Sequence, residues 1–118
     1  MATVSTVAFY KTIQSLEMSL SELKTDVTRD ASIRRFVYCI ELTWKCFRQK
    51  MGTSTTAPKQ VVREMAQNNF IQNVELWIEA IDYRNLSSHT YDEVLAEKVF
   101  VFAKSFLPEL KKLSDKLL

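Results

Sequence analysis

The chain has 118 residues, of which 47% are apolar and 25% charged, and its formal net charge is +2. This composition is typical of a globular protein with one core and excludes an intrinsically disordered chain. A protein held on nucleic acid by its overall field is usually more basic, so any contact with RNA has to be local. One glycine and two prolines leave little material for hairpins, which favours long helices joined by few turns.

The two cysteines and the single histidine form no zinc motif. Cys39 and Cys46 lie on one predicted helix, separated by a rise of about 10.5 Å, which is beyond disulfide reach. Reduced thiols are typical of proteins in a reducing compartment. The N-terminus lacks a basic-then-apolar signal, and the longest strongly apolar run, residues 99–103, is too short to span a bilayer. We therefore expect a cytoplasmic protein that binds no metal and no cofactor.

The first two predicted helices are amphipathic. In the first, apolar residues recur at steps of three and four, which predicts a narrow buried seam. Its members are Phe9, Ile13, Leu16, Leu20, Leu23 and Val27. The second helix has a stronger apolar face, made of Ile33, Phe36, Val37, Ile40, Trp44, Phe47 and Met51. Gly52, the only glycine, is the natural left-handed residue to end the second helix.

A polar linker and a short helix are predicted in the middle of the chain. Residues 53–57 are mostly polar, and Pro58 suits the first turn of a helix that runs to about Gln67. Asn68 and Asn69 can end this helix, because asparagine tolerates the left-handed region better than most residues.

Two further long helices follow. The third begins near Asn73 and fades at residues 86–88, and its inward residues are Val74, Trp77, Ile78 and Ile81. The fourth opens with Thr90-Tyr91-Asp92-Glu93, which predicts a capping box with Thr90 as N-cap and Glu93 as the third helical residue. Its apolar stripe consists of Leu95, Val99, Phe102, Phe106, Leu110, Leu113 and Leu117. Pro108 interrupts that stripe and should kink or split the helix.

The predicted fold is all-α. No strand pattern, internal repeat or low-complexity block separates the helices. The simplest arrangement is a single domain over residues 1–118, an up-and-down four-helix bundle with one extra short helix.

Polar side chains gather at the corner between the third and fourth helices. Arg84 falls in the last turn of one helix and His89 just before the predicted cap of the next, so a break between them lets both side chains converge. Arginine binds a phosphate through two parallel N–H bonds, and histidine moves a proton to or from a ribose hydroxyl. The corresponding reaction is metal-independent RNA cleavage by the neighbouring 2′-hydroxyl. The candidate residues are Arg84, Asn85, Ser87, Ser88, His89 and Tyr91.

The same residues also fit a structural interpretation, which spacing alone favours. Arg84 would then complement the negative end of its helix, worth a few tenths of a kcal/mol to about 1 kcal/mol. His89 would be a packed or solvated loop residue. One histidine per chain supplies either the base or the acid of a cleavage reaction, so catalysis would need a dimer that brings two such corners together.

The corner resembles the signature of a known superfamily. RNLSSHTYDE, preceded by the helix WIEAIDY, is similar to the corresponding corner of HEPN proteins. More closely, the chain resembles the nucleotidyltransferase substrate-binding proteins within that superfamily, because IRRFVYCIELTWKCF matches their apolar second helix with its Glu-Leu-x-Trp-Lys core. The likeness covers nearly the whole chain, and nothing departs from the Arg-polar-x3-His-x-Tyr motif.

The resemblance implies a four-helix bundle that dimerises and pairs with a separately encoded minimal nucleotidyltransferase, often as a toxin–antitoxin operon. By position, it implies that Arg84 and His89 are the ribonuclease pair and that Asn85 is the polar residue that follows the arginine. Tyr91 would match the tyrosine that the nucleotidyltransferase modifies with AMP in some pairs. Two hypotheses follow: a subunit that binds a nucleotidyltransferase, and an active endoribonuclease toxin. They are compatible, because a neutralised toxin is also a bound partner.

Overall fold

The computed structural model describes residues 6–117, which are almost entirely helical. Its α-helices are α1 (Thr6–Ser21), α2 (Asp26–Met51), α3 (Pro58–Gln67), α4 (Val74–Leu86) and α5 (Glu93–Ser114). Two short 3-10 helices, η1 (Ser87–His89) and η2 (Asp115–Leu117), follow α4 and α5. The described residues include no strand, so the all-α prediction is confirmed. The predicted limits of the domain, residues 1–118, extend into the terminal residues 1–5 and 118, which lie outside the described part.

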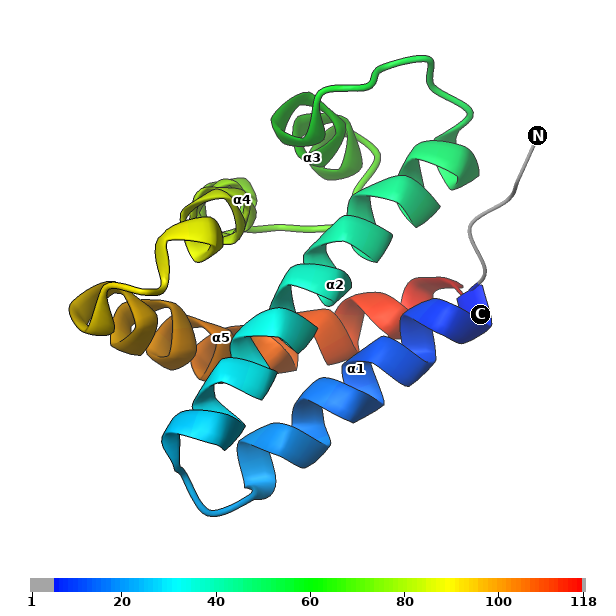
Figure 1. The fold of residues 1–118 in the computed structure, drawn as a ribbon. Coiled ribbons are helices and arrows are strands. Elements are labelled where there is room, and N and C mark those ends of the chain that lie inside the picture. The colour runs from blue at the N-terminus through cyan, green and yellow to red at the C-terminus, as the bar shows by residue number, and fades with distance from the viewer. Residues whose placement is uncertain (1–5, 118) are drawn as a thin grey trace.

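The helices are arranged around α2, which contacts α1, α3, α4 and α5. Figure 1 shows α1 lying alongside α2, with α3 and α4 on the other side of it and α5 crossing behind. The core therefore lies between the central helix α2 and the helices that surround it, from α1 near the N-terminus to α5 near the C-terminus. The finer expectation of an up-and-down four-helix bundle stays a prediction.

The first helix is shorter in the structure than the sequence predicts. α1 ends at Ser21, and the chain turns before Asp26. Thr25 caps α2 instead: its hydroxyl accepts the Thr28 N–H, while the Thr28 hydroxyl accepts the Thr25 N–H. This reciprocal cap satisfies backbone N–H groups at the start of α2. The first helix and its apolar seam therefore end before Thr25. Two apolar members of the predicted seam are consequently exposed, Leu23 at 84% and Val27 at 78%.

The predicted end of α2 and both ends of α3 are confirmed. Gly52 follows α2 in the left-handed region with φ of 68°. Pro58 is the first residue of α3, and Asn69 takes a positive φ of 63° just after its end. Each position has the residue type whose backbone preference suits it, which is why these boundaries can be read from the sequence.

Aromatic side chains fill the centre of the core. Trp77 is 2% exposed and meets Phe106 edge-on, with ring centroids 4.6 Å apart. Phe106 stacks on Phe102 at 5.3 Å, and Phe36 from α2 meets both rings edge-on. Such pairs contribute about 0.5–1.5 kcal/mol each beyond the area they bury. Trp77 therefore joins α4 to α5, as its predicted core position requires.

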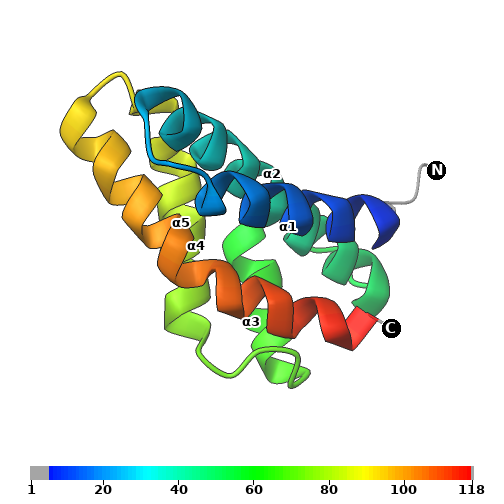
Figure 2. The same cartoon turned by 90° about the horizontal axis from the view of Figure 1, so that it is seen from below.

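Pro108 lies inside α5 without splitting it, because α5 continues to Ser114. Figure 2 shows the axis of α5 changing direction towards its C-terminal half. A proline removes one backbone hydrogen bond and crowds the preceding turn, which accounts for a kink. The bend keeps the last turns of α5 against α1, where the Tyr10 hydroxyl donates to the Ser114 carbonyl at 2.6 Å.

Both cysteines are buried free thiols on α2. Burial raises the pKa of Cys39 to about 12 and also raises the pKa of Cys46. Because the thiolate is the reactive form, we expect neither thiol to react with a disulfide reagent in the native protein, whereas both react in guanidinium chloride. Colorimetric thiol titration with and without denaturant checks this. Rapid labelling of either thiol in the folded protein would contradict the burial.

None of the helices within residues 6–117 is long and apolar enough to cross a membrane.

Candidate functional site

The corner between α4 and α5 is a tight, hydrogen-bonded turn. α4 ends at Leu86, and residues Ser87–His89 continue it as a single 3-10 turn. The predicted Thr90 cap is wrong: α5 begins at Glu93, and the Asp92 carboxylate accepts the N–H groups of Val94 and Leu95. A carboxylate at the positive end of a helix is the stronger acceptor, so it displaces the threonine. His89 therefore lies three residues before the cap and not next to it.

The hydroxyl groups of the corner close the turn. Ser87 donates to the Arg84 carbonyl, Ser88 to the Asn85 carbonyl and Thr90 to the Ser87 carbonyl. These bonds satisfy acceptors that the end of α4 leaves without partners. Ser87 and Ser88, which the sequence suggests as weak substrate-binding residues, thus have a structural role in the isolated chain.

Arg84 is tied to two acceptors at the end of α4. Its Nη2 lies 2.5 Å from Glu41 Oε1 of α2, and its Nη1 donates to Asn85 Oδ1 at 2.9 Å. The Nε–H of Arg84 is buried and has no partner in the described residues. The side chain of Arg84 is 35% exposed, so it lies at the surface. Its two Nη atoms are bonded to Glu41 and Asn85, and its Nε is buried.

His89 and Tyr91 form an exposed pair beyond the end of α4. The Tyr91 side chain is 83% exposed, and its hydroxyl lies 3.5 Å from His89 Nδ1. The two rings meet edge-on with centroids 6.0 Å apart. Tyr91 lies in the turn before α5 and not at the first helical position predicted for it.

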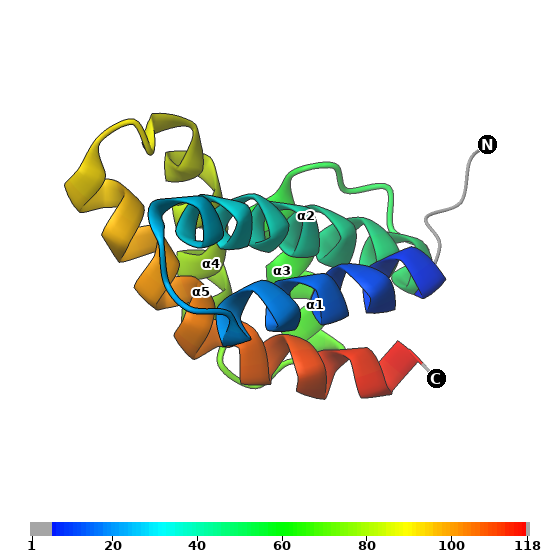
Figure 3. The same ribbon diagram turned by 60° about the horizontal axis from the view of Figure 1, so that its bottom comes forward.

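The structure places all six predicted site residues at one end of the molecule, and four of them form two separate pairs. Figure 3 shows the α4–α5 corner at the end opposite the start of α1 and the end of α5. Arg84 contacts Asn85, and His89 contacts Tyr91, but no hydrogen bond or ion pair joins Arg84 to His89 within residues 6–117. Within one chain the corner therefore brings an arginine and an imidazole to the same end of the molecule without a direct bond between them.

A groove of about 530 Å³ adjoins the corner. Ser87 and Thr90 form one side of it, and the first half of α2 forms the other. Within it, Arg34 Nε donates to the Tyr38 hydroxyl at 2.6 Å, and the guanidinium lies over the Tyr38 ring. The groove gives the corner a polar and aromatic continuation along α2.

One residue that holds the corner in place is absent from the sequence-based interpretation. Arg29 is 4% exposed and pairs with Glu93 at 2.6 Å and Glu97 at 3.3 Å, both on the first turns of α5. It also binds Asp30 at 3.1 Å, with Asp26 at 3.9 Å. These contacts raise the pKa of Arg29 above its ordinary value, the Glu93 hydrogen bond contributing most. In the sequence, the nearby Asp26 and Asp30 could have indicated that Arg29 forms ion pairs. Its partners on α5 are far away in the chain, so sequence spacing does not predict them.

The described residues contain no group of three or more His, Cys, Asp or Glu side chains placed to hold a metal ion.

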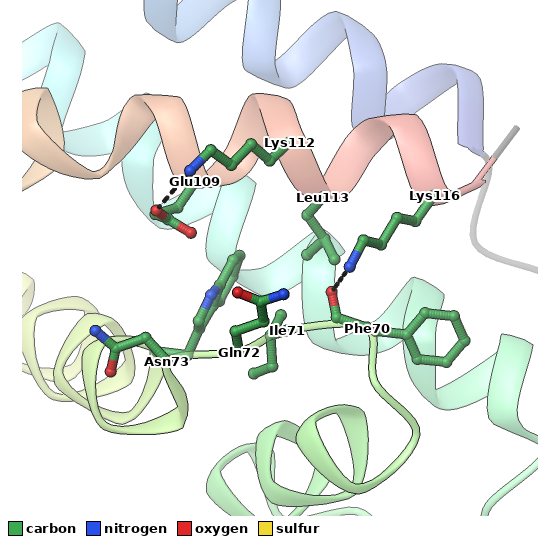
Figure 4. A pocket seen from close by; sticks show the side chains of 9 residues that line it. Phe70, Ile71, Gln72, Asn73, Glu109, Lys112, Leu113 and Lys116 are labelled. Carbon is green, nitrogen blue, oxygen red and sulfur yellow. Dashed lines mark hydrogen bonds and ion pairs between the residues drawn. The ribbon is translucent and has the colours of Figure 1, made fainter.

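A second cavity, of about 420 Å³, lies away from the corner, between the α3–α4 loop and the end of α5. Figure 4 shows Lys112 directed to Glu109 and Lys116 to the Phe70 carbonyl, at 3.6 and 2.7 Å. Both lysines that line it are therefore already paired. No predicted site residue lines this cavity, so the corner remains the candidate site.

Three similarities to known proteins agree with these observations. Residues 5–118 match the family described as "nucleotidyltransferase substrate binding protein like". The chain is 24% identical to a Haemophilus influenzae protein named "Probable ribonuclease HepT", over 93% of this chain and 86% of that protein. It also superimposes on a crystal structure from Thermus thermophilus with a TM-score of 0.84 and 28% identity, covering 92% of this chain and 98% of the other. The chain belongs to the nucleotidyltransferase substrate-binding protein family of the HEPN superfamily.

Proposed function

We propose that this chain is a HEPN-type subunit that binds a minimal nucleotidyltransferase, as the toxin half of a toxin–antitoxin pair. Family membership supports the pairing, since the description of the family names nucleotidyltransferase substrate binding. In this proposal residues 1–118 are one domain and act as a homodimer. The bundle helices are α1, α2, α4 and α5, and α3 is the extra short helix.

The exposed Tyr91 carries this proposal. A side chain that is 83% exposed at a projecting turn is accessible to the active site of a partner enzyme. In the proposed modification, Tyr91 Oη attacks the α-phosphorus of ATP, a phosphodiester bond forms, pyrophosphate leaves and the phenolic proton is lost. His89 Nδ1, at 3.5 Å from that oxygen, is placed to accept the proton. An AMP group there would cover the corner and add negative charge beside Arg84 and His89.

Replacing Tyr91 with phenylalanine is expected to abolish adenylylation without weakening the complex. The chain is co-purified with the nucleotidyltransferase encoded next to it, incubated with ATP and Mg²⁺, and weighed by intact-protein mass spectrometry. Wild type should gain the mass of one adenylyl group, and Tyr91→Phe should gain none because no other group replaces the phenolic oxygen. Tyr38→Phe is the matched control, since Tyr38 is also exposed, at 45%, but lies on α2. Failure to associate with the nucleotidyltransferase contradicts the binding proposal, and an adduct that survives Tyr91→Phe contradicts the site.

A second function, a metal-independent endoribonuclease, is supported by Arg84 and His89 at one exposed corner and by the relative named a probable ribonuclease. In this reaction His89 removes the proton from a ribose 2′-hydroxyl, whose oxygen attacks the neighbouring phosphorus. Arg84 stabilises the charge that develops on the phosphoryl oxygens. The 5′-oxygen of the next nucleotide leaves as the P–O bond breaks, and it receives its proton from His89 of the second protomer in a homodimer. The products are a 2′,3′-cyclic phosphate and a free 5′-hydroxyl.

A further inference from the structure

Arg84 of α4 forms an ion pair with a residue of the neighbouring helix α2. Glu41 Oε1 lies 2.5 Å from Arg84 Nη2, and the two side chains are 21% and 35% exposed. The second contact of the guanidinium, to Asn85, is to its immediate neighbour in the chain. Glu41 is therefore the group that fixes the direction of Arg84 relative to the body of the protein.

Glu41 is itself held in place. The Trp44 indole N–H donates to Glu41 Oε1 at 3.4 Å, and Lys45 Nζ lies 3.7 Å from Glu41 Oε2. Lys45 also lies over the Trp44 ring, at 5.7 Å from its centroid. A carboxylate with a donor on each oxygen and its own helix behind it has little freedom to rotate. It can orient an arginine more firmly than an isolated surface carboxylate could.

The buried Nε–H of Arg84 shows that the tip contacts determine the conformation. An enclosed N–H without an acceptor is unfavourable, so this orientation persists only if other contacts of the side chain offset that cost. Those contacts are the ones to Glu41 and Asn85. Without Glu41, the long side chain would be expected to swing out and hydrate its Nε–H.

We propose that Glu41 is a positioning residue: it holds the Arg84 guanidinium at the corner so that a phosphate bound beside His89 meets it without reorganisation. The catalytic purpose of this positioning rests on the proposed ribonuclease function, whereas the restraint of Arg84 by Glu41 does not depend on it. Fixing an arginine before binding reduces the side-chain entropy that is lost when the phosphate arrives. In the proposed ribonuclease reaction the group that meets Arg84 is a phosphodiester of RNA, and Glu41 acts only through Arg84.

The restraint is measured directly by the NMR relaxation of the Arg84 Nε–H group. Its resonance is identified as the one that Arg84→Lys removes, and its burial slows exchange with water. In wild type the ¹⁵N–¹H NOE of this group should resemble that of the backbone of α4. In Glu41→Ala it should fall to the value of exposed arginines such as Arg63, and Glu41→Gln, which keeps an acceptor, should lie between. Glu79→Ala is the matched control, because Glu79 is an exposed glutamate of α4.

The consequence for the reaction is tested with a short single-stranded RNA labelled at both ends. Glu41→Ala should reduce the rate of cleavage by about 10- to 100-fold, the usual effect of removing an orienting partner. In an Arg84→Ala background the same substitution should reduce it no further, since a residue that acts only through Arg84 has nothing left to position. A structural role would instead lower the rate in both backgrounds, and circular dichroism of each variant shows whether the helices remain.

The two possible failures are distinguishable. If the Arg84 Nε–H is as mobile in wild type as in Glu41→Ala, or if the two substitutions add, Glu41 does not position Arg84 and the inference is overturned. If Arg84→Ala cleaves and binds the RNA as wild type does, the proposed ribonuclease site is wrong, whatever the NOE shows.

Discussion

His89→Ala, produced without a nucleotidyltransferase partner, is expected to lose both growth arrest and RNA cleavage. The loss should be at least about 10²-fold in rate, the usual contribution of general acid–base catalysis by one side chain. The chain has a single histidine, so no second imidazole can replace it. In a homodimer the substitution would remove the base and the acid together, which places the expected effect towards the upper end, about 10⁴-fold.

The assay uses purified protein, labelled single-stranded RNA and EDTA, and cyclic-phosphate ends identify the reaction. Ser105→Ala is a control away from the corner, since the Ser105 hydroxyl donates to the Phe102 carbonyl of its own helix. It should retain nearly full activity. A wild-type protein that leaves RNA intact, or a His89→Ala protein that remains toxic, contradicts the proposed mechanism. Cleavage that EDTA abolishes would show that a metal is required.

Several helix boundaries could be predicted because each is marked by a residue with a local backbone preference. Gly52 and Asn69 take left-handed conformations, and Pro58 opens α3. Asn73 caps α4 by accepting the Leu76 N–H. In each case the information lies within a few residues, so no knowledge of the tertiary structure is needed.

The boundaries that were wrong involve competition between nearby signals. The seam from Phe9 continues in the sequence to Val27, but the reciprocal cap of Thr25 and Thr28 starts a new helix there. At the corner, Thr90 and Asp92 both suit an N-cap, and the carboxylate is the one that accepts the α5 N–H groups. Periodicity and motif spacing do not measure which of two local hydrogen-bonding arrangements has the lower free energy.

The sequence predicts which residues lie at the corner between α4 and α5, but it does not predict the contacts that these residues make. Arg84 lies in the last turn of α4 as expected, whereas His89 lies in the short 3-10 turn after it and three residues before the α5 cap. The residue that orients Arg84 comes from the middle of α2, far away in sequence, and only the packing of α4 on α2 brings it near. That residue is Glu41, the glutamate of the Glu-Leu-x-Trp-Lys core of α2, and its position in the sequence does not predict a contact with Arg84.

Arg29→Met is expected to destabilise the fold by about 2 kcal/mol and to loosen the corner. Methionine keeps the length and apolar bulk of the side chain but leaves Glu93, Glu97, Asp30 and Asp26 without their shared cation. Removing one partner of a fully buried pair costs about 3–5 kcal/mol. Here the carboxylates are largely exposed, with Glu93 at 72% and Glu97 at 44%, so they can rehydrate and the cost should be smaller. Urea denaturation followed by circular dichroism measures the change.

Lys111→Met is the matched control, because it breaks the Lys111–Glu17 pair, whose side chains are 53% and 47% exposed. It should cost less than about 1 kcal/mol, as exposed pairs do. The pH dependence separates the two sites further. Hydrogen bonds from Lys24, chiefly, and from Arg29 lower the pKa of Glu97, so the stability that this carboxylate contributes is present above the ordinary glutamate pKa and is lost as the pH falls through the lowered one. Arg29 stays charged throughout. The penalty of Arg29→Met should therefore shrink as the pH falls below the ordinary glutamate range, and a penalty that stays constant below that range would show that Arg29 acts through packing rather than charge.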